Sequence, residues 1–227
     1  MDSAGPRSIG VIMDGNRRWA RARGLPTLEG HRAGAEKIFD LVSWAHAAGI
    51  EEVTVYAFSS ENWQRAEEEV GYLMTLAEEL FTRELPRFEE AGARLRFIGD
   101  RAQASARLQE AMDTAEKRTA EGAKGTIVFA FSYGGRPEIL AGVNRLLLEG
   151  KTAVTEQGFK DALWSAGLLD PDLILRTGGE QRLSNFLTWQ SAYSELFFVD
   201  TLWPDLSREE FDAVIETYAA RDRRHGK

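Results

Sequence analysis

Short apolar segments with β-strand character alternate with helix-like segments along nearly the whole of this 227-residue chain. Runs of β-branched and aromatic residues predict strands at 9–13, 53–58, 93–98, 126–131, 173–175 and 196–199. Helices are predicted at 17–23, 31–48, 70–88 with a kink at Pro86, 104–121, 136–148 and 155–166, and after Ser207. This alternation predicts an α/β fold with a mostly parallel sheet covered by helices.

The composition is that of a soluble globular protein, with 43% hydrophobic and 28% charged residues. We find no internal repeat, low-complexity segment or linker, so residues 1–227 are predicted to form a single domain with a continuous core. No apolar run is long enough to span a bilayer, and the first residues lack a signal-peptide pattern. The absence of cysteine excludes disulfides and thiol catalysis, and it favours a cytoplasmic location.

The net charge of −8 argues against nucleic-acid binding, but the charge is unevenly distributed. Residues 1–32 hold six arginines and three acidic residues. A basic segment on an acidic protein indicates a local anion site.

The segment 9–23 has the form of a phosphate site. A buried strand ends at Asp14-Gly15-Asn16, a sequence that favours a turn, and an arginine-rich helix follows. Backbone N–H groups and cations then point at one spot, which suits a phosphate or diphosphate. Asp14 fits such a site if a divalent cation joins its carboxylate to the phosphate, as Mg2+ does in many proteins.

A second loop carries Arg176, Gly178, Arg182 and Ser184, directly after a predicted strand. One arginine guanidinium can bind two phosphate oxygens at once, and the serine hydroxyl adds a further hydrogen-bond donor. Two such loops indicate two diphosphates or one larger polyphosphate. In a parallel sheet, the polar clusters that follow strands should meet at one edge, where ligands bind; these clusters are 14–18, 59–65, 132–136 and 176–184.

Motifs of several common enzyme classes are absent. The chain has no Walker A loop, dinucleotide fingerprint, nucleophile elbow or zinc-protease helix. Among its three histidines, His31 lies beside the arginine cluster and could assist a leaving group or orient a phosphate, whereas His46 is expected to be structural or exposed. Arg224-His225-Gly226 is either a solvated tail or a cationic arm that reaches a partner's site, and taken alone its position near the terminus favours the tail.

Several blocks, in order along nearly the whole chain, resemble the cis-prenyltransferase family, which includes undecaprenyl diphosphate synthase. The blocks are Met13-Asp14-Gly15-Asn16-x-Arg18-Trp19-Ala20, Gly30-His31-x-x-Gly34, Tyr56-Ala57-Phe58-Ser59-Ser60-Glu61-Asn62-Trp63-x-Arg65, Tyr133-Gly134-Gly135-Arg136, Arg176-Thr177-Gly178-Gly179-Glu180-x-Arg182-x-Ser184-Asn185-Phe186, Trp189-Gln190, Glu195-Leu196 and Leu202-Trp203-Pro204-Asp205. The aspartate-rich repeats typical of trans-prenyltransferases are absent.

The resemblance implies a homodimer whose chain forms a six-stranded, mostly parallel sheet. It also implies a hydrophobic cleft between the sheet and the helices near 32–48 and 67–91. The expected partners are isoprenoid diphosphates, and the expected cofactor is Mg2+. A long product would add peripheral contact with a membrane.

The resemblance also implies roles for particular residues. Asp14, Asn62 and His31 are expected to be catalytic, and Asp14 and Glu195 to handle the metal. Residues expected to bind substrate are Gly15, Asn16, Arg17, Arg18, Trp19, His31, Ser59, Trp63, Arg65, Arg176, Arg182, Ser184, Arg224 and Gly226. Arg224 and Gly226 match a C-terminal Arg-x-Gly that reaches across the dimer in the family. The chemistry agrees, because an allylic diphosphate needs charge stabilisation as it leaves, and its carbocation needs an apolar cleft.

The chain departs from the family pattern at Thr27 and Ala66, where arginine and proline are usual. Thr27 removes a cation from the donor site, although Arg17, Arg21 or Arg23 could compensate. Three functions follow from these patterns. The first is head-to-tail coupling to isopentenyl diphosphate, and the second is irregular head-to-middle coupling that gives lavandulyl or cyclolavandulyl diphosphate. The third is a non-catalytic partner subunit. Product length stays open, with Tyr72, Phe81 and Phe88 as candidates for the floor of the cleft.

Overall fold

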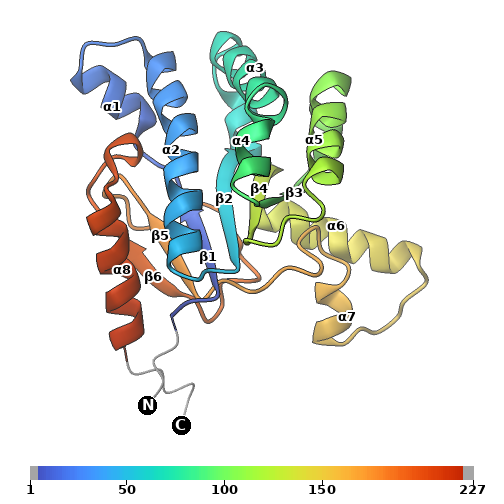
Figure 1. The fold of residues 1–227 in the computed structure, drawn as a ribbon. Helices are drawn as coiled ribbons and strands as arrows, with labels where there is room; N and C mark the ends of the chain where they lie inside the picture. The colour runs from blue at the N-terminus through green and yellow to red at the C-terminus, as the bar shows by residue number, and fades with distance from the viewer. Residues whose placement is uncertain (1–4, 222–227) are drawn as a thin grey trace.

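The computed structural model describes residues 5–221 and places six strands in one sheet, in the order β3-β4-β2-β1-β5-β6 (Figure 1). The strands are β1 (Ser8–Ile12), β2 (Glu52–Ser59), β3 (Arg94–Ile98), β4 (Thr126–Tyr133), β5 (Leu173–Arg176) and β6 (Glu195–Phe198). Every pairing between neighbouring strands is parallel, whereas the sequence predicted a mostly parallel sheet. The predicted α/β class and the six strands are confirmed.

The helices of the described residues connect these strands and cover the sheet (Figure 1). They are α1 (Asn16–Ala22), α2 (Thr27–Ala47), α3 (Glu67–Thr82), α4 (Leu85–Glu90), α5 (Ala106–Arg118), α6 (Gly135–Leu148), α7 (Glu156–Lys160) and α8 (Arg208–Ala220). No helix within residues 5–221 combines the length and apolarity needed to cross a membrane.

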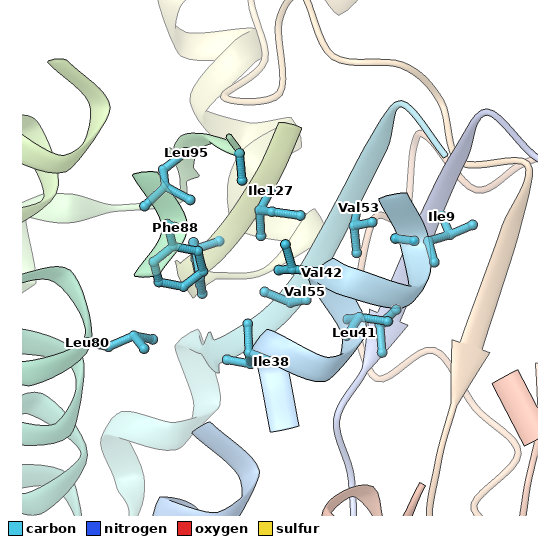
Figure 2. Packing of buried hydrophobic residues seen from close by; sticks show 14 of the residues in the cluster. Ile9, Ile38, Leu41, Val42, Val53, Val55, Leu80, Phe88, Leu95 and Ile127 are labelled. Atoms are coloured by element: carbon cyan, nitrogen blue, oxygen red, sulfur yellow. The ribbon is translucent and has the colours of Figure 1, made fainter. Parts of the chain in front are cut away.

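The core forms on both faces of the sheet because successive strand residues point to opposite sides. In β4, Ile127 and Phe129 belong to the larger apolar cluster, and Val128 belongs to the cluster on the other face. The larger cluster packs the sheet against α2, α3, α4, α5 and α8. Figure 2 shows Leu41 and Val42 of α2 lying close to the strands within this cluster. Burial of each such side chain contributes about 2 kcal/mol.

The predicted helix over 70–88 is two helices. The chain leaves α3 after Thr82 and begins α4 at Leu85, which places Pro86 in the first turn of α4. Backbone N–H groups in the first turn of a helix have no acceptor within that helix, so the N–H that proline lacks is not missed there, and Pro86 starts a helix instead of kinking one.

Two other predicted helices need correction. The predicted helix over 155–166 ends as α7 at Lys160, after which Leu163 turns onto α6 at Gly142. A Cβ on Gly142 would lie 3.0 Å from a Leu163 methyl group, so the missing side chain permits this packing. The predicted helix over 104–121 is α5, capped by Ser105. It spans Ala106–Arg118, and its buried face consists of Leu108, Ala111, Met112 and Ala115.

A buried carboxyl group at the start of β2 gives the fold a pH dependence. Glu52 is 7% exposed, and its Oε1 accepts a hydrogen bond of 3.0 Å from the Leu169 amide. Burial raises the pKa of Glu52 from 4.5 to about 7, although this hydrogen bond and the charge of Arg96 oppose the shift. Between these pH values the folded state binds more protons than the unfolded state.

We therefore expect Glu52 to destabilise the fold progressively as the pH rises from 4.5 through 7. The full loss is about 3 kcal/mol above pH 8. The side chain of the Glu52→Gln variant stays neutral at every pH. The free energy of unfolding of the variant, minus that of the wild type, should therefore be larger at pH 8 than at pH 5. Urea unfolding at both pH values measures this difference. Equal differences at pH 5 and pH 8 would contradict the expectation.

Candidate active site

The first predicted phosphate loop follows β1 and enters α1. Gly15 caps α1 with a left-handed φ of 113°, and a Cβ there would lie 2.9 Å from a Leu202 methyl group. Glycine alone meets both requirements without strain. The turn opens a cavity of about 380 Å³ lined by Met13, Asp14, Gly15, Asn16, Arg17, Arg18, Arg21, His31 and Arg65. The structure thus gathers four arginines around one carboxylate, which suits a ligand with several negative charges.

Asp14 is held from both sides by guanidinium groups. Its Oδ2 accepts a hydrogen bond of 2.8 Å from Arg176, and its Oδ1 lies 3.3 Å from Arg18. Its backbone is fixed by Thr177, whose Oγ1 accepts from the Asp14 amide and donates to the Asp14 carbonyl. These contacts join the end of β1 to the end of β5, as parallel pairing of the two strands requires.

Arg176 organises the second predicted phosphate loop from a nearly buried position. One nitrogen donates to the Ser184 hydroxyl at 2.8 Å and to the Arg182 carbonyl, and a second nitrogen donates to Asp14. Its Nε is buried and has no hydrogen-bond partner. Arg182 pairs with Glu180. A buried donor without a partner costs free energy, which a ligand oxygen at this place would recover.

The loop after β2 closes a second polar cavity of about 530 Å³ between the two phosphate loops. Its lining includes Asp14, Asn16, His31, Ser59, Glu61, Asn62, Arg65, Arg176, Ser184 and Asn185. The Asn62 side chain accepts from the Ser59 amide at 3.1 Å, which holds the loop in a tight turn. The Trp63 indole N–H donates to the Ser132 hydroxyl at 2.9 Å and fixes the loop on β4.

Glu69 at the start of α3 contacts three of the side chains that line the first polar cavity. Its Oε1 lies 3.1 Å from His31 Nε2, 3.0 Å from an Arg65 nitrogen and 4.0 Å from Arg17 Nε. Burial lowers the pKa of His31, and its contact with Glu69 opposes this shift only in part. His31 is therefore neutral at pH 7, so it donates or accepts a hydrogen bond there without acting as a cation.

An apolar cavity of about 90 Å³ lies between the sheet and helices α2 and α3, as the predicted cleft requires. Met13, Asn16 and His31 line this apolar cavity and also the polar cavity at the turn between β1 and α1, so the two cavities adjoin. Phe81 and Phe129 line it as well, with ring centroids 4.9 Å apart. Of the three residues considered for the floor, Phe81 is in the lining, while Phe88 packs on Phe39 and Phe129.

The site suits Mg2+ only together with a phosphate ligand. Residues 5–221 contain no group of three or more acidic or histidine side chains placed to hold a metal. Asp14 offers one carboxylate at the junction of the two polar cavities. One or two carboxylates with substrate phosphates are a common magnesium environment, so Asp14 fits as the protein ligand.

Some predicted site residues lie elsewhere. Glu195 begins β6 beside Leu173, at the amino-terminal edge of the sheet, and pairs with Arg221. At about 3.3 Å per strand residue, it is separated from the edge that holds Asp14 by roughly 10 Å, so the two carboxylates do not share one ion within a chain. The Trp19 indole donates to Asp205 at 2.7 Å and therefore holds α1 in place. Arg224 and Gly226 lie outside the described residues.

Sequence reasoning missed the partners that support the site. Thr177, Glu61 and Asn185 stand inside motifs that we recognised, but the contacts that they make join segments far apart in the chain. Glu69 follows Glu67 and Glu68 in the acidic first turn of α3, and it is not among the predicted site residues. Its helical position alone carries no signal of three basic partners.

The comparisons with known proteins agree with this geometry. Residues 12–226 match the family model described as "Putative undecaprenyl diphosphate synthase". The isoprenyl transferase of Agrobacterium fabrum is 46% identical over 227 residues, covering 97% of this chain and 92% of that protein. The isoprenyl transferase of Thermotoga maritima is 43% identical, covering 97% of each.

Two solved structures have the same fold over nearly the whole chain. Lavandulyl diphosphate synthase from Lavandula x intermedia, in complex with dimethylallyl diphosphate, has a TM-score of 0.94 and 29% identity, with complete coverage of both chains. A probable undecaprenyl diphosphate synthase from Campylobacter jejuni has a TM-score of 0.83 and 32% identity, covering 98% of this chain and 99% of that chain.

The six-stranded parallel sheet with its covering helices is the fold of these cis-prenyltransferase structures. The chain belongs to the undecaprenyl diphosphate synthase family of cis-prenyltransferases. Its curated relatives carry the name isoprenyl transferase, and the chain is an enzyme of this kind.

Proposed function

We propose that the enzyme transfers an allylic prenyl group from an allylic diphosphate to isopentenyl diphosphate, head to tail, with release of diphosphate. The observation that carries this proposal is the place of Asp14, between the Arg18 loop and the Arg176 loop. One diphosphate at each loop would bring a leaving group and an acceptor to the two sides of one carboxylate. The adjoining apolar cavity would receive the prenyl chain.

The residues divide the reaction between them. Arg17, Arg18 and Arg65 would stabilise the charge of the departing diphosphate, which develops as the allylic carbon–oxygen bond breaks. Bound Mg2+, with Asp14 as its protein ligand, would supply further charge stabilisation there. Arg176 and Ser184 would hold the acceptor diphosphate, with Arg182 beside them. The allylic carbon then bonds to the terminal alkene carbon of the acceptor, and a proton leaves. Apolar walls exclude the water that would trap the cation.

Product analysis tests this function directly. Purified enzyme with Mg2+ is incubated with dimethylallyl diphosphate alone and then with isopentenyl diphosphate added, and dephosphorylated products are identified by mass spectrometry. A linear product that needs isopentenyl diphosphate supports head-to-tail coupling. A branched or cyclic ten-carbon alcohol from dimethylallyl diphosphate alone replaces it with irregular coupling. No product, even with longer allylic primers, favours a partner subunit.

Irregular coupling is the second candidate, because Thr27 stands at the sequence position where the family usually has an arginine that binds the allylic diphosphate. The similarity to a lavandulyl diphosphate synthase, with a TM-score of 0.94, also favours it. We expect Thr27→Arg to tighten binding of dimethylallyl diphosphate about tenfold, since a charged hydrogen bond to phosphate contributes about 1.5 kcal/mol. Isothermal titration calorimetry measures the dissociation constant. An unchanged value would show that other arginines already replace the missing cation.

Phe81 is a candidate for limiting the length of the product. It lines the apolar cavity next to Phe129, with ring centroids 4.9 Å apart. We expect Phe81→Ala to shift the product distribution by at least one isoprene unit toward longer chains, at a stability cost of about 3–5 kcal/mol. Chromatography of the dephosphorylated products checks this. Identical distributions in both proteins would remove Phe81 from the floor of the cavity.

We further propose that the enzyme is a homodimer in the cytoplasm. The edge strand β6 exposes Leu196, and the nearby Tyr193 is 90% exposed. Exposed apolar groups beside an unpaired strand edge are typical of an interface. A partner chain could also bring Glu195, Arg224 and Gly226 to the acceptor site, as the family resemblance implies. Sedimentation equilibrium distinguishes a dimer from a monomer.

A further inference from the structure

Three loops at the carboxyl edge of the sheet meet at one side chain, Asn185. The Asn185 carbonyl accepts from the Gly135 amide at 2.7 Å, and its Oδ1 accepts from the Arg136 amide at 2.9 Å. Its Nδ2 donates to Glu61 Oε1 at 3.0 Å. The loops that follow β2, β4 and β5 are therefore joined by a single residue.

The surrounding residues are shaped for these contacts. Asn185 has a left-handed φ of 66°, which asparagine tolerates better than most residues. A Cβ on Gly134 would lie 2.7 Å from Asn185 Nδ2 and 2.6 Å from Ser60 Oγ, so only glycine leaves room there. Burial raises the pKa of Glu61, but hydrogen bonds led by that from Asn185 outweigh burial and hold it below 4.5. Glu61 is thus an anion at neutral pH.

Each end of this contact stands next to a residue of the proposed site. Asn185 follows Ser184, whose hydroxyl accepts a hydrogen bond from Arg176. Glu61 precedes Asn62, whose side chain lines the same polar cavity. Ser184 itself has a left-handed φ of 50°, a conformation that its surroundings must maintain. Holding Asn185 in place therefore also holds Ser184.

We propose that Asn185 and Glu61 form a positioning clip that sets the acceptor diphosphate site against the loop that carries Asn62. The inference rests on the proposed function, since it assigns the Arg176 loop to the acceptor. Neither residue is catalytic. The clip acts through Ser184 and Arg176, so its loss should weaken acceptor binding and leave donor binding largely unchanged.

Asn185→Gly is the informative substitution, because glycine keeps the left-handed backbone and removes only the side chain. We expect the KM for isopentenyl diphosphate to rise about tenfold, because the substitution removes the side-chain hydrogen bonds to Glu61 and to the Arg136 amide that hold the loop. The KM for the allylic diphosphate should change less than about twofold. The matched control is Asn144→Ala on the exposed surface of α6, which should leave both values unchanged. Equal increases in both KM values for Asn185→Gly would overturn the clip.

A double-mutant cycle tests whether Asn185 acts through its contact with Glu61. Glu61→Ala should also raise the acceptor KM about tenfold, and the double variant should show about the same increase as Asn185→Gly, because both changes remove the hydrogen bond between Asn185 and Glu61. Additive effects, about a hundredfold in the double variant, would overturn the coupling.

Amide hydrogen exchange tests the clip without any prenyl transfer. The Arg136 amide donates to Asn185 Oδ1, so its exchange should accelerate at least about tenfold in Asn185→Gly and stay unchanged in Asn144→Ala. If the wild-type enzyme transfers no prenyl group to isopentenyl diphosphate, the proposed function fails, and with it the acceptor role of the clip. Unchanged exchange at Arg136 in an active enzyme would overturn the clip alone.

Discussion

Asp14→Ala is expected to lower the kcat of prenyl transfer by at least about a thousandfold while the protein remains folded. Asp14 supplies the carboxylate at the junction of the two polar cavities, and it orients Arg18 and Arg176 through contacts of 3.3 Å and 2.8 Å. Its loss removes the fitted metal ligand and leaves a buried guanidinium without its counter-charge. The measurement is single-turnover transfer with saturating substrates, with circular dichroism as the check of folding.

Two further variants distinguish the effect of losing the negative charge of Asp14 from a general loss of structure. Asp14→Asn keeps an oxygen that accepts from Arg176, so near-wild-type activity in this variant would exclude a role for the negative charge. Asp113→Asn makes the same change of charge in an exposed pair with Arg101. We expect this control to keep full activity, because exposed ion pairs contribute little.

The second large effect is expected for Arg176→Ala, which should reduce kcat/KM for the acceptor about a thousandfold. One buried side chain binds Ser184, the Arg182 carbonyl and Asp14, and its remaining nitrogen has no partner. Steady-state kinetics with each substrate varied in turn should place most of the loss in the KM for isopentenyl diphosphate.

Arg176→Lys tests whether the shape of the guanidinium group matters. A single ammonium group cannot reach Ser184, Asp14 and a phosphate oxygen in the same plane, so lysine should restore less than about a tenth of the activity. Full restoration would reduce Arg176 to a simple positive charge. The exposed Arg145, paired with Glu149 on α6, provides the control, and Arg145→Ala should behave as the wild type.

The sequence predicted the order of strands and helices because apolar periodicity is a local property. The break between α3 and α4 was misplaced, since Pro86 favours a helix start as well as a kink, and only packing decides between them. The end of α7 was misplaced for a similar reason, because contact with Gly142 of α6 outweighs local helical preference.

The site was predictable where motifs follow parallel strands, since topology alone brings such loops to one edge. Asp14 and Arg176 meet across 162 residues for this reason. Side-chain partners were not predictable in the same way. The contact of Trp19 with Asp205 and that of Glu69 with His31 depend on rotamers and on helix packing, which no local pattern records.

Helix α3 takes part in both halves of the site. Its first turn contributes Glu69 to the basic cluster, and farther along Leu73, Leu80 and Phe81 line the apolar cavity. Under the proposed function, a diphosphate at the basic cluster and a prenyl chain in the apolar cavity would both contact side chains held by α3, so their free energies of binding would be linked through this helix. Such linkage is reciprocal. If bound diphosphate strengthens the binding of the prenyl chain in an α3 variant, a bound chain must strengthen the binding of diphosphate by the same factor. Selection for a new product length on α3 would then alter substrate affinity at the same time.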